Sequence, residues 1–374
     1  MLIGVPREIK VREYRVGLTP TSVRELVAHG HEVVVETCAG AGIGMEDGDY
    51  VRAGARIAAS AADVFKDAEL IVKVKEPQAE ERRMLRRGQV LFTYLHLAPD
   101  PAQARDLVAS GATCIAYETV TSSAGGLPLL APMSEIAGRM AVQAGAYYLE
   151  KAHGGHGVLI GGVPGVDPAK VVIIGGGVVG THAAHIALGM GADVWVLDRN
   201  LEVLRRLWRQ FGRPLATVYS TRDAIDRHLR EADLVICGVL IPGAEAPKLI
   251  TREHVKSMKT GSVIVDVAID QGGCAETSRP TTHDEPTYIV DGVIHYCVAN
   301  MPGGVPKTST HALNNATLPF VLSLADKGWK RALSDDPHLL AGLNVWSGNI
   351  TCQPVAEALG MAYLPAGQAL AGGG

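Results

Sequence analysis

The sequence predicts an α/β protein with two doubly wound, Rossmann-like domains, each built on a mostly parallel sheet. Two stretches of the chain alternate short apolar strands with amphipathic helices, an alternation that is typical of parallel sheets covered by helices. The two stretches are separated by a long helix with small side chains on its surface and by a glycine-proline joint, GGHGVLIGGVPGVDP. The length of 374 residues also suits two domains.

The first alternating stretch predicts a helix at 20–29, because Thr19 is a suitable N-cap and Pro20 suits the first helical position. The long helix with small side chains follows at about 134–153, and we expect it to link the domains or to pack against a partner. The predicted strands of this stretch are 2–5, 33–35, 70–74, 90–92 and 114–117.

The second stretch predicts a doubly wound domain with helices at 201–211 and 251–258. After Pro306 we expect a helical tail that runs to about Met361 and returns to the first domain. The predicted domains are therefore a substrate domain, 1–132 plus 307–374, and a nucleotide-binding domain, 133–306, with a hinged cleft between them. The predicted strands are 170–175, 193–198, 216–220, 233–239, 262–270 and about 293–298.

Composition excludes several classes of protein. The 35 basic and 39 acidic residues give a net charge of −4, which provides no field for nucleic acid or anionic lipid. The six cysteines are scattered without a C-x-x-C pair, so they form neither a zinc framework nor a small disulfide scaffold. We expect free, mostly buried thiols and a cytoplasmic protein, since the amino-terminal segment lacks the apolar core of a secretory signal.

One uncharged stretch, 171–192, is long enough to span a bilayer. It begins as a β-branched run and contains six glycines and two histidines, so a strand, a turn and a helix fit it better. We therefore expect no membrane association.

A glycine-rich turn between a predicted strand and a predicted helix indicates a dinucleotide site. In this G-x-G-x-x-G motif Gly175 makes the tight turn, Gly177 lets the backbone approach a pyrophosphate, and Gly180 lets helix and strand pack closely. Asp198 ends the next strand, 18 residues after Gly180, at the usual place of a ribose-binding carboxylate. That position favours NAD over NADP, although the adjacent Arg199 could blur the choice.

Four polar residues stand where α/β sheets usually bind ligands, near the carboxyl ends of predicted strands. Arg15 follows the first strand, whereas Lys75, His96 and Asp270 end the segments LIVKVK, VLFTYLH and SVIVDVAID. Each of them alone could be an ordinary solvated side chain. Together they supply two cations for a small carboxylate, an imidazole for acid–base work and a carboxylate in the cofactor half.

Long motifs over nearly the whole chain resemble the alanine dehydrogenase family. These motifs are GVPREIKVREYRVGLTP at the start, KVKEP at 73–77, YLHLA at 94–98, LLAPMSEIAGR at 129–139, VDVAIDQGG at 265–273, HYCVANMPGGVPKTST at 295–310 and ALNNATLPF at 312–320. Some of them also occur in the NAD-binding subunit of the proton-translocating transhydrogenase and, more distantly, in saccharopine dehydrogenase.

The resemblance implies a role for each matching residue. Arg15 and Lys75 would bind the substrate carboxylate and carbonyl, and His96 and Asp270 would be the catalytic pair. NAD would be held by Ser134 at the pyrophosphate, by the glycine-rich loop with Val178, by Asp198 at the adenosine ribose, and by Ser220, Val239, Leu240, Val267, Ala268, Ile269, Asp270, Arg279, Val298, Ala299, Asn300 and Met301.

Two departures from the family pattern are visible. Val203 stands where family members often place a basic residue near the adenosine, so the affinity for adenosine would be modestly weaker. Lys327 and Gly328 offer no carboxylate–histidine pair, so we expect no metal there, and no metal site elsewhere.

The implied reaction is the NAD-dependent interconversion of L-alanine with pyruvate and ammonia. Met133 and Leu130 are candidates for a small methyl pocket. The resemblance and the small-faced helix favour a homo-oligomer, with a hexamer expected. Three alternatives remain open: the transhydrogenase subunit, a regulatory NAD-binding module, and saccharopine-type chemistry on a larger amino acid.

Overall fold

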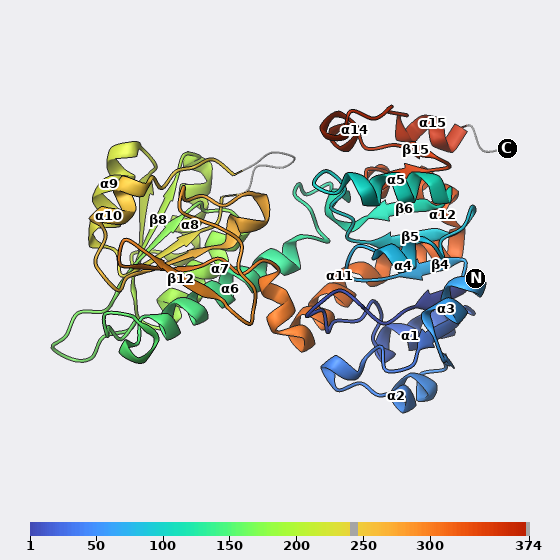
Figure 1. Ribbon diagram of the computed structural model, residues 1–374, viewed down its shortest axis with the longest axis horizontal. Coiled ribbons are helices and arrows are strands. Elements are labelled where there is room, and N and C mark those ends of the chain that lie inside the picture. The colour runs from blue at the N-terminus through green and yellow to red at the C-terminus, as the bar shows by residue number, and fades with distance from the viewer. Residues whose placement is uncertain (240–245, 372–374) are drawn as a thin grey trace. The chain divides into compact units, whose positions relative to one another are not determined.

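The computed structural model describes residues 1–239 and 246–371. The chain forms two compact units. Unit 1 comprises Met1–Met133 and Val305–Gly374, and unit 2 comprises Ser134–Gly304. Each unit is built on a mainly parallel sheet with helices (Figure 1), which confirms the predicted fold class.

The described residues of unit 1 form an eight-stranded sheet in the order β15-β14-β6-β5-β4-β1-β2-β3. Its strands β1 to β6 are parallel and have the Rossmann order 3-2-1-4-5-6. The strands are β1 (Leu2–Val5), β2 (Glu32–Glu36), β3 (Arg56–Ala58), β4 (Leu70–Val72), β5 (Val90–Thr93), β6 (Thr113–Ala116), β14 (Leu343–Trp346) and β15 (Asn349–Ile350).

The helices of unit 1 come from both ends of the chain. Thr19 caps α1 by accepting the backbone N–H of Ser22 at 3.3 Å, and Pro20 occupies the first turn, as predicted. The helices are α1 (Pro20–Ala28), α2 (Asp47–Arg52), α3 (Ala61–Asp67), α4 (Ala79–Arg82), α5 (Pro101–Ser110), α11 (Pro306–Lys327), α12 (Trp329–Asp335), α13 (Pro337–Leu340), α14 (Gln353–Leu359) and α15 (Ala366–Ala371), with short 3-10 turns η1 (Ala41–Ile43) and η2 (Tyr117–Thr119).

The expectation of an all-helical carboxyl-terminal tail is wrong, because β14 and β15 interrupt it. These two strands pair antiparallel, and β14 also pairs antiparallel with β6. Ser347 and Gly348 connect them with positive φ values of 45° and 87°, the left-handed backbone that tight hairpins favour. The segment therefore completes the sheet of unit 1 instead of only covering it.

The described residues of unit 2 form a seven-stranded sheet in the order β12-β13-β11-β10-β7-β8-β9, with β12 antiparallel to β13. Apart from β12, the strands are parallel and repeat the order 3-2-1-4-5-6. The strands are β7 (Lys170–Ile174), β8 (Asp193–Asp198), β9 (Leu215–Tyr219), β10 (Leu234–Cys237), β11 (Val263–Asp266), β12 (Thr287–Val290) and β13 (Val293–Tyr296).

The uncharged stretch 171–192 forms a strand, a turn and a helix, as predicted. Among the residues that the structure describes, no helix is both long and apolar enough to cross a bilayer. The helical elements of unit 2 are α6 (Ala131–Tyr148, which begins in unit 1), η3 (Lys151–His153), α7 (Val178–Gly189), α8 (Leu201–Phe211), α9 (Arg222–Glu231), α10 (Arg252–Ser257), η4 (Val267–Gln271) and η5 (Met301–Gly304).

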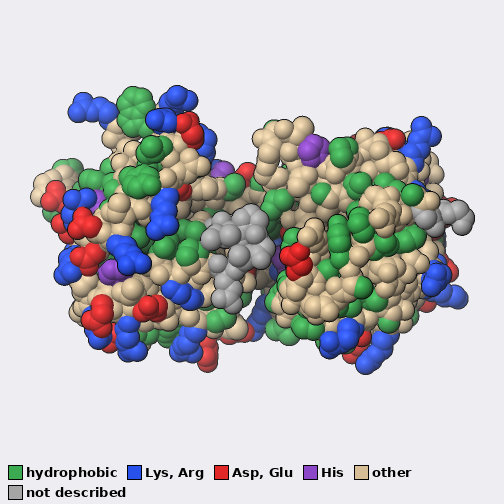
Figure 2. All heavy atoms as spheres, turned by 90° about the horizontal axis from the view of Figure 1, so that it is seen from above, with side chains coloured by type: hydrophobic (Ala, Val, Ile, Leu, Met, Phe, Trp, Pro, Cys, Tyr) green, Lys and Arg blue, Asp and Glu red, His purple; other side chains and the backbone are tan. Residues whose placement is uncertain are grey.

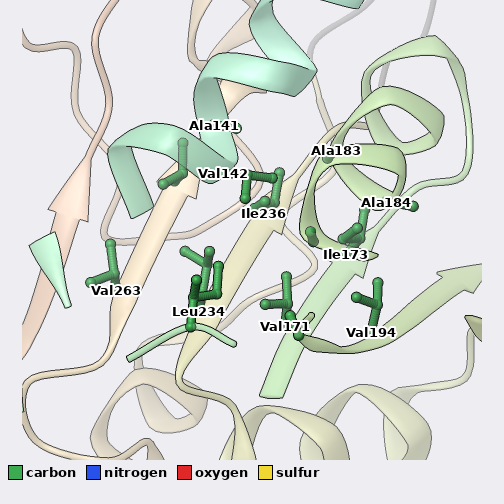
Figure 3. Packing of buried hydrophobic residues seen from close by; sticks show 14 of the residues in the cluster. Ala141, Val142, Val171, Ile173, Ala183, Ala184, Val194, Leu234, Ile236 and Val263 are labelled. Carbon is green, nitrogen blue, oxygen red and sulfur yellow. The ribbon is translucent and has the colours of Figure 1, made fainter. Parts of the chain in front are cut away.

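The small face of α6 packs within unit 2. A Cβ at Gly138 would lie 2.2 Å from the backbone oxygen of Val179, and one at Gly145 would lie 2.5 Å from the side chain of Leu234. These small residues let α6 approach α7 and β10 closely, so they no longer argue for a partner subunit. Figure 3 shows the shared core, in which Ala141, Val142, Ala183 and Ala184 of the helices meet Val171, Ile173, Val194, Leu234, Ile236 and Val263 of the strands.

Figure 2 shows basic and acidic side chains interspersed over the face in view, in keeping with the small net charge of the sequence.

All six cysteines are free thiols, and four of them, including Cys237 and Cys297, are buried as expected.

The turn from β7 into α7 is close-packed at two of its glycines. Gly175 has φ +98°, a conformation that other residues rarely adopt. A Cβ at Gly180 would lie 1.9 Å from the backbone oxygen of Gly175, so helix and strand can approach only because this side chain is absent. The physical reasons expected for these two glycines therefore hold in the structure.

We predict that Gly180→Ala lowers the free energy of unfolding by about 3 kcal/mol, because the added methyl must push the helix away from the turn. The matched control is Gly189→Ala on the same helix, where a Cβ meets nothing within 4 Å. That control should be neutral or stabilising by up to about 1 kcal/mol. Denaturant unfolding measures both variants, and equal stabilities would contradict the prediction.

Candidate functional site

Three of the residues expected to react lie on loops at one edge of the sheet of unit 1. Arg15 follows β1, Lys75 follows β4 and His96 follows β5, and these strands are parallel neighbours or next neighbours. The strand order turns back between β1 and β4, which is where open α/β sheets bind ligands. The fold thus gathers these side chains at the carboxyl edge of unit 1.

The guanidinium of Arg15 is buried and held by a carboxylate. Its Nε and Nη2 atoms donate to the two carboxylate oxygens of Glu13, each at 2.6 Å, and Nη1 lies 3.0 Å from the sulfur of Met133. Only 1% of Arg15 is exposed. Burial disfavours the charged form, but the hydrogen bonds and charge of Glu13 raise the pKa of Arg15. Arg15 is therefore a fixed, charged donor.

A buried ion cluster supports the loop that carries Lys75. Lys73 is fully buried, and its Nζ atom donates to Glu8 at 3.1 Å and to Glu81 at 2.6 Å. The other oxygen of Glu8 accepts the backbone N–H of Val74 at 2.7 Å and that of Lys75 at 3.4 Å. The half-buried Lys75 thus follows a strand end that is fixed by the contacts among Lys73, Glu8 and Glu81.

The two carboxylates of this cluster share one ammonium group. Burial lowers the pKa of Lys73, but Glu8 and Glu81 together raise it above its usual value. Burial raises the pKa of Glu8 more than the charge of Lys73 lowers it, and Glu81 adds to the rise. The pKa of Glu8 therefore lies above its usual value, and Lys73 stays charged.

His96 stands in an unusual backbone conformation at the end of β5. Its φ is +47°, in the left-handed region, and 44% of its side chain is exposed. The ring stacks on Tyr94 with 5.7 Å between centroids and 7° between planes. Tyr94 is itself anchored, since its hydroxyl donates to the backbone oxygen of Leu129 at 2.5 Å. The imidazole is thus exposed on one side and supported on the other.

Glu118, in η2 after β6, holds the backbone next to the imidazole. One of its oxygens accepts the N–H of His96 at 2.6 Å, and both accept the N–H of Leu95 at 3.2 Å. The same carboxylate lies 3.9 Å from Nδ1 of His96.

In unit 2 the glycine-rich turn and the ends of β8, β9 and β10 lie along the carboxyl edge of the parallel sheet. Asp198 is half-buried and accepts the backbone N–H of Gly176 and that of Asn200, each at 2.7 Å. Its carboxylate therefore shapes the turn while remaining a further acceptor. The expected contact residues at this edge are Gly175, Gly177, Val178, Gly180, Asp198, Ser220 and Val239.

Val203 has a packing role that its sequence position did not indicate. A Cβ at Gly176 would lie 2.6 Å from Cγ1 of Val203, so this side chain packs directly onto the turn. The choice of residue at position 203 thus affects the shape of the turn as well as the charge near it.

The strand expected at 262–270 ends at Asp266, and Asp270 lies in the 3-10 turn η4 that follows. The strand stops because the carboxylate of Asp266 turns back on the chain. It accepts the backbone N–H of Ala268 at 3.2 Å and that of Cys274 at 2.7 Å, and the hydroxyl of Ser278 at 2.6 Å. Asp270 is exposed on this capped turn. Of the other expected contact residues on the turn, Val267 and Ala268 are half-buried and Ile269 is buried.

The remaining expected cofactor contacts are distributed over unit 2. Arg279 is exposed and lies 4.2 Å from the ring of Tyr288 in a cation–π contact. Asn300 has a left-handed backbone with φ +60°. Ser134 opens unit 2 on α6, and Val298, Ala299 and Met301 follow β13. Leu240 lies outside the described residues.

Two clusters contain side chains that metals use as ligands. Within the described residues, Cys237, Asp266 and Cys274 have ligand atoms within 4.8 Å of one another and are all buried. Burial raises the pKa of Asp266, and a hydrogen bond with Cys274 together with burial raises that of Cys237. Asp266 already accepts hydrogen bonds from backbone and hydroxyl donors of the segment that follows it. This cluster therefore holds that segment against the end of β11.

The second cluster adjoins the region in which no carboxylate–histidine pair was expected. Asp326 of α11 lies 3.1 Å from Nδ1 of His29 and 2.8 Å from Nε2 of His31. Hydrogen bonds with His31 and His29 lower the pKa of Asp326. The expectation overlooked this contact because the partners are nearly three hundred residues apart in the sequence.

Sequence reasoning missed the carboxylates that support the site. Glu13 lies two residues before Arg15, and this i, i+2 spacing in an irregular loop gives no periodic signal. Glu8 and Glu118 each follow a strand by a few residues, which is the same position that drew attention to Lys75 and His96. Strand-end position could therefore have found Glu8 and Glu118, but it does not show which residues they contact.

Both halves of the chain match family models. Residues 4–137 match the N-terminal domain of alanine dehydrogenase/PNT, and residues 141–353 match the C-terminal domain of the same family.

Relatives match the chain over nearly all of its length. An alanine dehydrogenase of Halomonas elongata is 62% identical and covers 98% of this chain and 99% of its own, and one of Bacillus subtilis is 57% identical with 99% and 98% covered. A solved L-alanine dehydrogenase is 53% identical, with a TM-score of 0.93 over 96% of this chain and 99% of its own. A transhydrogenase from Sinorhizobium meliloti is 27% identical, with a TM-score of 0.80 over 94% and 99%.

Proposed function

The chain belongs to the alanine dehydrogenase/PNT family, and from this membership we propose that it catalyses the NAD-dependent oxidative deamination of L-alanine. The reaction gives pyruvate and ammonia, and the reverse reductive amination uses the same site. The supporting observation is 62% identity to an alanine dehydrogenase over nearly the full length of both chains.

Arg15 and Lys75 bind the substrate. The fixed guanidinium of Arg15 and the ammonium of Lys75 offer two cationic donors to a carboxylate and its neighbouring oxygen or nitrogen, and charged donors give short, strong hydrogen bonds. Met133 lies against Nη1 of Arg15 at 3.0 Å, so its side chain adjoins the bound carboxylate and limits the space beyond it. This contact favours a methyl group over a larger substituent.

Unit 2 holds the cofactor. The N-terminus of α7 presents backbone N–H groups to a pyrophosphate, and open space around Gly177 lets the phosphate approach, since a Cβ there would meet nothing within 4 Å. Asp198 accepts hydrogen bonds from ribose hydroxyls and repels a 2′-phosphate. When bound, NAD supplies a nicotinamide ring that accepts the hydride from Cα of alanine.

His96 and Asp270 handle the protons and the developing charge. Loss of hydride leaves an iminium on the substrate, to which water adds before ammonia departs. The exposed imidazole of His96 takes a proton from that water and returns it to the leaving nitrogen, as a general acid–base. It then takes the hydroxyl proton as the C–N bond breaks and the carbonyl of pyruvate forms. The carboxylate of Asp270 stabilises the positive nitrogen and orients the water.

We further place the protein in the cytoplasm as a homo-oligomer, a hexamer. The free thiols of its six cysteines fit a reducing compartment. The proposed partners are the small molecules alanine, pyruvate and ammonia, with no nucleic acid, membrane or metal.

The alternative, a hydride-transferring transhydrogenase subunit, is the more distant relationship. The transhydrogenase chain is 27% identical, against 62% for the alanine dehydrogenase of Halomonas elongata. A subunit that passes hydride to another protein also needs no amino-acid site, so Arg15, Lys75 and His96 together count against this alternative.

The direct test follows NADH absorbance with L-alanine and NAD at alkaline pH, where proton release favours oxidation. We expect turnover with alanine and none with L-lysine and 2-oxoglutarate. Absence of NADH formation from alanine, or hydride transfer only with an added transhydrogenase partner, would overturn the proposed function.

We predict that His96→Ala and Asp270→Asn each lower kcat by at least about 100-fold, the scale of lost general acid–base catalysis. Both side chains are exposed, so folding should be unchanged. Both variants should still bind NADH, which its fluorescence measures, because the other expected cofactor contacts remain. Near-normal turnover in either variant would show that its residue lacks the proposed role.

Asp198 is predicted to enforce the choice of NAD. Asp198→Asn keeps an oxygen for the turn but removes the charge, so kcat/KM with NADP should rise about tenfold, on the scale of one like-charge contact. Arg199→Ala is the matched control and should leave NADP rejected. If Asp198→Asn still prefers NAD as strongly as the unaltered enzyme, another group enforces the choice.

A further inference from the structure

We propose that Glu118 is the positioning residue of His96, holding its backbone in place and setting a carboxylate beside its ring. The inference rests on the proposed function, in which His96 moves the protons of the reaction. It goes beyond that function because it assigns a role to a carboxylate that contacts His96 but need not contact the substrate.

The first part of this role is a clamp on the backbone. A left-handed conformation is unfavourable for histidine, and such strain persists only where the surroundings fix it. Glu118 accepts the N–H groups of Leu95 and His96, at distances between 2.6 and 3.2 Å. The side-chain amide of Gln103 donates to the backbone oxygen of Leu95 at 2.6 Å. The peptide groups before His96 are thus held from η2 on one side and from α5 on the other.

The second part of the role of Glu118 is to orient the imidazole ring of His96. Tyr94 covers one face of the imidazole, and Glu118 lies on the Nδ1 side at 3.9 Å. A carboxylate beside Nδ1 favours the tautomer that carries its proton there, which leaves Nε2 to accept a proton. It also stabilises the positive charge that His96 gains when it takes the proton of water.

The strand topology explains why Glu118 can act on His96. β5 and β6 are parallel neighbours paired at Thr93 and Ala116, so the residues that follow these two strands emerge side by side. His96 is the third residue after the first of these ends, and Glu118 the second after the other. Only 14% of the Glu118 side chain is exposed, so its hydrogen bonds to the backbone are little weakened by water.

Two substitutions distinguish the effect of the backbone hydrogen bonds of Glu118 from the effect of its negative charge. Glu118→Gln keeps an oxygen for the backbone N–H groups but loses the negative charge, whereas Glu118→Ala loses both. We expect kcat for alanine oxidation to fall about tenfold in Glu118→Gln and about 100-fold in Glu118→Ala, the range found when a residue that orients a metal-binding side chain is replaced. KM for NAD should stay within about twofold, because unit 2 binds the cofactor. Glu25→Gln, an exposed carboxylate of α1, is the control and should behave as the unaltered enzyme.

Hydrogen exchange gives a readout that does not depend on turnover. The amides of Leu95 and His96 should exchange at least about tenfold faster in Glu118→Ala and at the original rate in Glu118→Gln. Unchanged exchange in Glu118→Ala would overturn the clamp, and full kcat in Glu118→Gln would overturn the role of the charge.

The outcomes distinguish this inference from the proposed function. If the unaltered protein does not oxidise alanine, the proposed function fails while hydrogen exchange still tests the clamp. If the unaltered protein is active and Glu118→Gln equals it, the role of the charge is wrong and the proposed function stands. Should Glu118→Ala fail to fold, the kinetics of Glu118→Gln and its D2O effect decide: an increased solvent isotope effect on kcat supports slowed proton transfer at His96, and an unchanged one opposes it.

Discussion

Parallel strands joined by crossover helices bring all of their carboxyl ends to one edge of a sheet, and the candidate site depends on this constraint. Arg15, Lys75 and His96 are far apart in the sequence, yet each follows a strand of the same parallel set. The same rule brings the glycine-rich turn, Asp198 and η4 to one edge in unit 2. Both sheets have the order 3-2-1-4-5-6, so each unit has its switch point beside its first strand.

Carboxylates offset the cost of placing cations at such an edge. A buried charge is expensive unless it is paired and hydrogen-bonded. Glu13 meets this requirement for Arg15, and Glu8 with Glu81 meets it for Lys73. The resulting geometry is rigid, which orients a small substrate more sharply than flexible surface lysines would. The pairing also reduces the net positive field, so recognition depends on directed hydrogen bonds more than on charge.

Local patterns in the sequence predict much of the fold and part of the site. The alternation of apolar runs predicts the order of strands and helices, and G-x-G-x-x-G followed by Asp198 predicts the turn between β7 and α7. The hairpin β14–β15 was missed because it is stabilised by pairing with β6, far away in the sequence. The end of β11 was misplaced because VDVAID continues as an apolar run, whereas the bonds of Asp266 to Cys274 and Ser278 determine where the strand stops. Pairs such as Glu118 with His96 depend on neighbouring strands, which composition and spacing do not reveal.

The division of unit 1 between the two ends of the chain has a consequence for folding during synthesis. β6 pairs on one side with β5, but its other partner, β14, is made only after residues 117–342. Until then the nascent sheet has an open edge that can pair with another chain. Unit 2 is contiguous and can complete its sheet once Gly304 has left the ribosome. The inserted unit can therefore fold first, while the unit that contains the amino terminus must wait for the last part of the chain.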